Sequence, residues 1–147
     1  MSIWNKKLSL DELNAMGKNT AIENLGIKLT KVGDDTLVGE MPVNSKSHQI
    51  HGILHGGASV LFAETLGSLA GVMACKEGFT AVGLEINANH LKGVKDGIVI
   101  GVASAIHIGR STHVWDIKIT HKETGKIVCA SRLTVAVIKE VKSNIWK

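Results

Sequence analysis

The chain has few aromatic side chains and only two cysteines. Aromatic residues make up 3% of its 147 residues and Tyr is missing, so few rings can stack on bases and nucleic acid is not an expected partner. Cys75 and Cys129 form no CxxC pair and lie among apolar residues. This setting is typical of buried free thiols in a reducing compartment.

Motifs of several enzyme classes are also missing. There is no GxSxG nucleophile motif, no GxGxxG or P-loop for phosphates, and no HExxH or Cys/His cluster for zinc. No metal or prosthetic group is therefore predicted. His48, His51 and His55 share one loop, which leaves adventitious zinc binding as the alternative.

The N-terminal sequence, the net charge and the length limit the location, the ligands and the number of domains that can be expected. The first residues, MSIWNKKLSLDELN, lack the apolar core of a signal peptide, so a cytoplasmic location is expected. The net charge of +4 serves solubility or attracts a phosphorylated ligand. The length suits one core without disulfides, and we expect a single domain over 1–147.

The most apolar stretch, from His55 to Cys75, contains one charged residue, Glu64. It is about as long as a membrane span, but it also carries four glycines, two serines and a threonine. A buried helix at about 56–76 is the better interpretation, and no membrane is expected as a partner. Its apolar residues surround the axis, so a sheet or a second protein must cover most of it.

Turn residues and apolar alternation divide the rest of the chain. A capping box from Ser9 to Glu12 predicts a short helix that ends at Gly17. One long helix with an antiparallel sheet wrapped over it is an α+β fold. Within 97–108 the alternating apolar side chains are Ile98, Ile100, Val102 and Ile106. We expect a turn at 20–24, strands at 26–32, 36–43, 81–92, 97–108, 112–121 and 127–139, and antiparallel hairpins at 95–97, 109–111 and 123–125.

Glu64 is the strongest candidate for chemistry, because a carboxylate among apolar residues is costly unless it has a use. It can attack a carbonyl as a nucleophile or deprotonate water. The Gly56-Gly57 pair opens the helix, where unpaired N–H groups can stabilise charge on a carbonyl oxygen. Gln49 can donate to the same oxygen, and Ser68, one helical turn beyond Glu64, can orient water.

Most of these residues also have a structural interpretation. The two glycines suit any sharp turn, and His55 can cap the helix or act as a base. Gln49 can be an ordinary loop amide, and Ser68 a small packing residue. Glu64 is the exception, because an unpaired carboxylate among apolar residues is functional more often than structural.

The same residues resemble the hotdog-fold thioesterases, and most closely the bacterial aromatic acyl-CoA thioesterases. The resemblance extends over nearly the whole chain, including IWxxKxxLxxLNAMG at the start and SRLT near the end. It implies a long helix enclosed by a curved antiparallel sheet. It also implies a homo-oligomer, a dimer or a dimer of dimers, with active sites at the dimer interface. The similar run is Gln49, His55-Gly56-Gly57, Glu64 and Ser68, followed by Val82 to His90.

The resemblance also implies a role for each matching residue. Glu64 matches the catalytic nucleophile or general base, and Gly56 the backbone donor to the thioester carbonyl. Gln49 assists that donor, while His55 and Ser68 support substrate and water. Lys92 and Arg110 suit phosphates, although ordinary surface charges are the alternative. The positions that match coenzyme A contacts are Gly83, His90, Lys92, Arg110 and Ser111.

The implied activity is hydrolysis of an aromatic acyl-CoA, of the 1,4-dihydroxy-2-naphthoyl-CoA or hydroxybenzoyl-CoA type, to the free acid and coenzyme A. Coenzyme A is part of the substrate, so no cofactor is expected. The alternatives are a medium-chain acyl-CoA thioesterase, a catalytically silent acyl-CoA-binding module, and a hotdog dehydratase.

Overall fold

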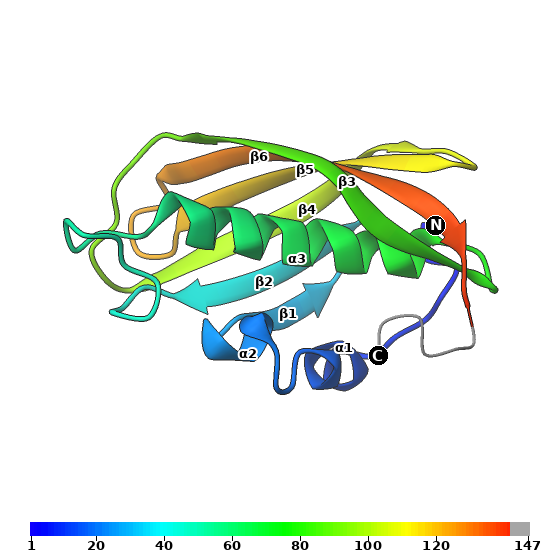
Figure 1. Cartoon of the computed structure of the whole chain (residues 1–147), viewed down its shortest axis with the longest axis horizontal. Coiled ribbons are helices and arrows are strands. Elements are labelled where there is room, and N and C mark those ends of the chain that lie inside the picture. The colour runs from blue at the N-terminus through cyan, green and yellow to red at the C-terminus, as the bar shows by residue number, and fades with distance from the viewer. Residues whose placement is uncertain (142–147) are drawn as a thin grey trace.

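A computed structural model describes residues 1–141. One long helix lies along the concave face of a curved antiparallel sheet, and two short helices lie beside the sheet at its β1 edge (Figure 1). This arrangement confirms the predicted α+β hotdog architecture. The elements are α1 (Leu10–Met16), α2 (Ala21–Asn24), β1 (Lys28–Val32), β2 (Thr36–Pro42), α3 (Gly56–Ala74), β3 (Phe79–His90), β4 (Ile98–Ile108), β5 (Thr112–His121) and β6 (Ile127–Lys139).

The strand order is β1-β2-β4-β5-β6-β3, and every pair is antiparallel. The predicted hairpins at 109–111 and 123–125 are confirmed, but the one at 95–97 is wrong. β3 pairs with β6 and forms an edge of the sheet. The 91–97 segment instead crosses to β4 in the middle of the sheet. Two backbone hydrogen bonds hold this segment: Leu91 N–H donates to Val128 O at 2.8 Å, and Leu54 N–H donates to Val94 O at 2.7 Å. Turn residues predict where the chain reverses direction, but they do not determine which strands then pair with each other.

In β4 the buried face is not the one that carries most of the large apolar residues. Val99, Gly101 and Ala103 are buried, whereas Ile106 is 50% exposed. A Cβ at Gly101 would stand 2.4 Å from Cδ1 of Leu66, so only small residues let the helix lie this close. The predicted alternation of buried and less buried residues is confirmed, but it is the opposite set of residues that is buried. Side chains of α3 fill the space beside these small buried residues.

α3 fills the centre of the fold. It begins at Gly56, as predicted, and ends at Ala74, two residues earlier than 56–76. Its side chains Phe62, Leu66 and Ala70 are fully buried. By length and hydropathy alone α3 could cross a membrane, but half of its apolar window is buried against the sheet. It is therefore the core helix of this fold.

The N-terminal segment closes the far end of α3. The N–H groups of Asn5 and Lys6 donate to Met73 O at 3.0 and 2.9 Å, and Asn5 Nδ2 donates to Ala74 O at 2.7 Å. Lys6 Nζ donates to Phe79 O at 2.7 Å. Helix C-termini leave carbonyl groups without intrahelical donors. Here the first residues of the chain supply those donors.

A buried histidine lies near the same end. His113 is 2% exposed and meets Trp115 edge-to-face, with ring centroids 6.2 Å apart. Burial, and secondarily the neighbouring His107, lower the pKa of His113. Cys75 and Cys129 are buried free thiols, as predicted, and burial raises the pKa of both.

Candidate active site

His55 is the N-cap of α3. Its backbone is extended, with φ −67° and ψ 132°, and its Nδ1 accepts the N–H of Gly57 at 2.8 Å. Accepting at Nδ1 requires that atom to be unprotonated, so a neutral ring carries its proton on Nε2. His55 thus has the capping position that was one of its two interpretations, and the N–H of Gly57 is already occupied.

Gly56 presents the remaining donor at this helix end. Within residues 1–141 its N–H has no hydrogen-bond partner. A Cβ on Gly56 would stand 2.8 Å from Nε2 of His90 on β3, so a bare backbone and an imidazole ring lie against each other. The unpaired N–H at the positive end of a helix dipole suits a carbonyl oxygen that gains negative charge.

Gln49 lies in a tight loop just before the helix. Gln49 N–H donates to Ile53 O at 2.8 Å, and Gly52 N–H donates to Gln49 O at 3.0 Å. Gly52 has φ +73°, which favours glycine. The side-chain oxygen of Gln49 accepts the N–H of His51. The amide orientation therefore leaves the Nε2 hydrogens available as donors.

Glu64 lies near the middle of α3. It is partly exposed, and within residues 1–141 its carboxylate forms neither a hydrogen bond nor an ion pair. A Cβ at Gly83 would stand 2.6 Å from Glu64 Oε1. The carboxylate therefore lies against the bare backbone of β3.

Glu64 also lines an apolar cavity of about 370 Å³ between α2 and α3. Ser68 lines the same cavity, as its helical spacing from Glu64 predicts. The remaining walls come from Leu61, Thr65 and Leu69 of α3, from Ala21 and Ile22 of α2, and from Thr20 at the α2 cap. A carboxylate and a hydroxyl at the edge of an apolar space can act on a polar bond whose apolar part is buried there.

Glu64 and Gly56 are too far apart along α3 to act on one carbonyl within a single chain. At a rise of 1.5 Å per residue, their backbones are separated by about 12 Å along the helix axis. In the sequence the two residues belong to the same apolar stretch, which suggested one site, but the helix keeps them apart within one chain. Within one chain Gly56 faces His90, and Glu64 faces Gly83.

The residues matched to coenzyme A contacts form two groups in one chain. Gly83 and His90 lie on β3, and the exposed Lys92 follows that strand near the start of α3. Arg110 lies in the β4–β5 turn and lines a different cavity, at the end of α3, together with Lys76 and His113. Ser111 follows Arg110 in that turn. One chain therefore does not bring Arg110 and Ser111 to the His90 end of α3.

Two features of the site had no signal in the sequence. His90 lies against Gly56 because of the register of β3, and α2 contributes walls to the Glu64 cavity. The 20–24 segment shows only a capping threonine before a short turn, so its contact with α3 depends on tertiary packing alone.

The histidine-rich loop does not form a ligand cluster. His48 Nε2 donates to Lys95 O at 2.7 Å, and His55 caps α3. Over residues 1–141 no three His, Cys, Asp or Glu side chains are grouped so as to hold a metal ion.

Comparison with known proteins identifies the family. The model of the thioesterase superfamily matches residues 51–128, which include the α3 start and Glu64. The Vibrio cholerae protein "Putative esterase VC_A0580" is 53% identical over 137 residues, which are 93% of this chain and 91% of that protein.

Solved structures agree with this match. Thioesterase HI1161 from Haemophilus influenzae has 44% identity and a TM-score of 0.92, covering 97% of this chain and 99% of its own. A Q49A variant of thioesterase PA1618 from Pseudomonas aeruginosa has 46% identity and a TM-score of 0.91, covering 95% of this chain and 100% of its own. The chain belongs to the thioesterase superfamily of hotdog-fold proteins and is a thioester hydrolase.

Proposed function

We propose that this protein hydrolyses acyl-CoA thioesters, with an aromatic acyl group as its preferred substrate. The observation that carries the proposal is the Glu64 carboxylate, which has no partner within residues 1–141 and lies at the edge of an apolar cavity. The medium-chain alternative uses the same cavity and the same carboxylate. A location in the cytoplasm suits a coenzyme A substrate.

The reaction is the addition of water to the thioester carbonyl and loss of coenzyme A. The carbonyl oxygen accepts the Gly56 N–H and a Gln49 Nε2 hydrogen, which stabilise its negative charge in the transition state. If Glu64 acts as a general base, it removes a proton from water as the water attacks, the C–S bond breaks, and the sulfur leaves as the coenzyme A thiol with that proton. If Glu64 attacks the carbonyl carbon itself, the C–S bond breaks first, coenzyme A leaves, and water then hydrolyses the acyl-Glu64 anhydride to the free acid and restores the carboxylate.

The active site in this proposal combines two copies of the chain. The Gly56 and Glu64 backbones are about 12 Å apart along one helix, so each site takes Gly56 from one subunit and Glu64 from the other. β3 offers the contact, because it is a 12-residue edge strand and unpaired edges are templates for a further strand. Leu84 and Leu91 at this edge are 61% and 55% exposed.

The packing of α3 on β3 defines the register that this dimer needs. Glu64 lies over Gly83 and Gly56 lies over His90. Two β3 strands can pair antiparallel so that Gly83 of one copy lies opposite His90 of the second copy. In this register Glu64 of the first copy lies toward Gly56 of the second. The symmetry axis then passes between Ile86 and Asn87. A dimer of dimers is compatible with this pairing, and the same assembly provides a route for Lys92 and Arg110 of different subunits to share one coenzyme A.

The test is turnover of Glu64→Gln and Glu64→Ala, measured as free thiol release from benzoyl-CoA and octanoyl-CoA. Loss of the carboxylate should lower kcat by about 10²–10⁴-fold. Glu77→Gln, an exposed carboxylate beyond the end of α3, is the matched control and should retain full activity. Wild-type turnover in both Glu64 variants would refute the mechanism. Binding of benzoyl-CoA without any thiol release by the wild type would identify a silent binding module.

A further inference from the structure

We propose that Ile22 of α2 is the end wall of the acyl-binding cavity and sets the length of acyl group that the enzyme accepts. This inference rests on the proposed function, because it assigns the Glu64 cavity to the acyl part of the substrate. The cavity contains the reactive carboxylate, and its other walls are almost entirely apolar. An apolar space beside the reacting group is where the part of a thioester beyond its carbonyl is best buried.

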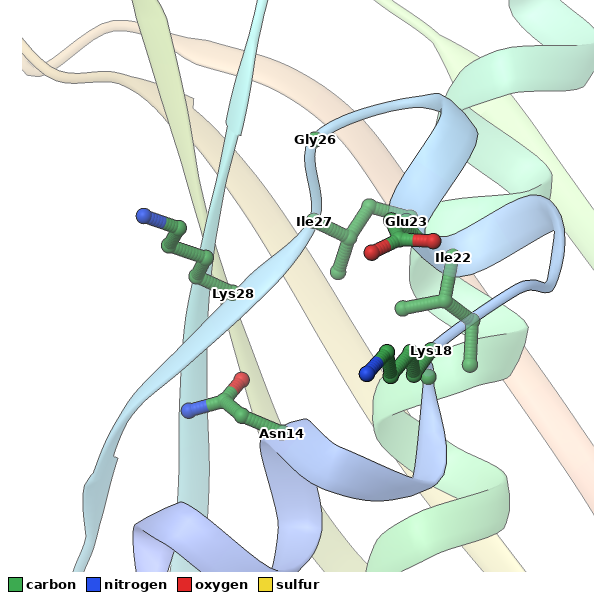
Figure 2. A pocket seen from close by; sticks show the side chains of 8 residues that line it. Asn14, Lys18, Ile22, Glu23, Gly26, Ile27 and Lys28 are labelled. Carbon is green, nitrogen blue, oxygen red and sulfur yellow. The ribbon is translucent and has the colours of Figure 1, made fainter.

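Ile22 separates this cavity from a second one. A cavity of about 340 Å³ lies on the other side of α2 and is lined by Asn14, Lys18, Glu23 and Ile27 among others (Figure 2). Ile22 is the one residue that lines both cavities. Shortening this side chain therefore connects the Glu64 cavity to a space of similar size.

The wall is held firmly in place. Thr20 caps α2 by accepting the N–H of Ile22 at 3.2 Å, and its hydroxyl donates to Gly17 O at 2.7 Å. A Cβ on Gly17 would stand 2.9 Å from Cγ2 of Ile22, so the isoleucine packs directly on that backbone. A β-branched side chain has few rotamers, and this contact restricts it further.

The wall belongs to the subunit that supplies Glu64. Ala21, Ile22 and Glu64 of one chain line one cavity, whereas the Gly56 donor comes from the second copy in the proposed dimer. One subunit thus selects the acyl group and provides the carboxylate, and the other polarises the carbonyl.

The experiment measures kcat/KM for butanoyl-, octanoyl- and dodecanoyl-CoA and for benzoyl-CoA. Discrimination between substrates depends on this ratio, and one methylene in an apolar pocket changes it by about 10-fold or more. Ile22→Ala should raise the dodecanoyl to butanoyl ratio at least about tenfold. Ile22→Phe, which adds volume at the same place, should lower the same ratio. Ile22→Val removes one methyl group and should shift the ratio in the same direction as Ile22→Ala, by less.

Leu25→Ala is the matched control. Leu25 follows the same helix and packs on the same core, but it lines neither cavity. Its truncation should leave the chain-length ratio unchanged. The inference is overturned if Leu25→Ala and Ile22→Ala shift the ratio equally, or if neither Ile22→Val nor Ile22→Ala shifts it. The proposed function survives that result as long as the wild type hydrolyses these substrates and Glu64→Gln does not.

Discussion

The Glu64 carboxylate packs against the backbone of Gly83, so that a Cβ at residue 83 would stand 2.6 Å from Oε1. That distance is too short for a real contact, and the flexible carboxylate must move when a methyl group is added. We therefore expect Gly83 to position Glu64 without taking part in the chemistry.

Gly83→Ala should lower kcat by about 10-fold or more, since displacement of a reacting group by 1 Å can cost 10²-fold. KM should change less, because Gly83 does not line the Glu64 cavity that is proposed to hold the acyl group. Lys31→Ala, an exposed residue of β1 at the opposite edge of the sheet, is the control and should retain the wild-type kcat. An unchanged kcat in Gly83→Ala would mean that Glu64 acts from another position.

A second prediction concerns the N–H of Gly56, which occupies the first position of α3. Proline is well tolerated at this position, and it removes the N–H. Gly56→Pro should lower kcat by about 10²–10³-fold, the typical effect of losing one oxyanion donor.

Gly56→Ala is the matched variant, because it adds a Cβ at the same place while keeping the N–H. Both variants meet Nε2 of His90, 2.8 Å from the new Cβ, so this steric effect is common to them. The difference between their kcat values therefore reports the hydrogen bond. Equal activities would show that the N–H does not contact the carbonyl.

A third prediction concerns the N-terminal segment. Asn5→Ala removes the donor to Ala74 O at the end of α3 and should lower the free energy of unfolding by about 0.5–1.5 kcal/mol. Urea unfolding measures this loss. Lys7→Ala should have almost no effect, because Lys7 is exposed and makes no hydrogen bond or ion pair within the described residues. Equal losses in the two variants would contradict this account of how α3 ends.

A fourth prediction concerns pH. Burial lowers the pKa of His113 below its unfolded value, so the unfolded chain binds a proton to this residue at a higher pH than the folded chain does. Stability should therefore fall as the pH drops below about 6.5, the usual pKa of histidine, and this loss should end below the folded pKa.

His113→Leu should remove that part of the loss. One histidine contributes at most about 1.4 kcal/mol per pH unit to the slope. Near pH 8 the variant should be at least as stable as the wild type, because the substitution also removes a buried Nδ1 atom with no hydrogen-bond partner within residues 1–141. Identical slopes between pH 5 and 6.5 would refute this assignment.

The sequence predicted those parts of the fold that depend on local chemistry. The capping box of Ser9 and Glu12, the start of α3 at Gly56 and the bounds of β5 and β6 all agree with the structure. Caps, turns and alternation act between residues a few positions apart, and so they can be recognised in a single chain.

The errors concern contacts between distant segments. β3 pairs with β6 rather than β4, and β4 buries small residues because α3 supplies the bulk. The candidate site shows the same limit. Glu64 was recognisable as an isolated charge, whereas the packing of Ile22 beside it required the tertiary structure.

In the proposed dimer each active site combines Gly56 of one subunit with Glu64 of another. The most direct test is to co-express Glu64→Gln and Gly56→Pro chains with different affinity tags and to purify the mixed oligomers through both tags. Each parent alone should retain about 1% or less of the wild-type turnover. In a mixed dimer one of the two sites has both groups intact, so turnover should recover to as much as about half that of the wild type.

The reciprocal experiment pairs the wild type with a chain that carries both substitutions. If the sites combine two subunits, both sites of this mixed dimer lack one group, and its activity should be close to zero. If Gly56 and Glu64 act within one chain, the results reverse: the first mixed dimer is inactive, and the second retains about half of the wild-type activity. That reversal would contradict the two-subunit site.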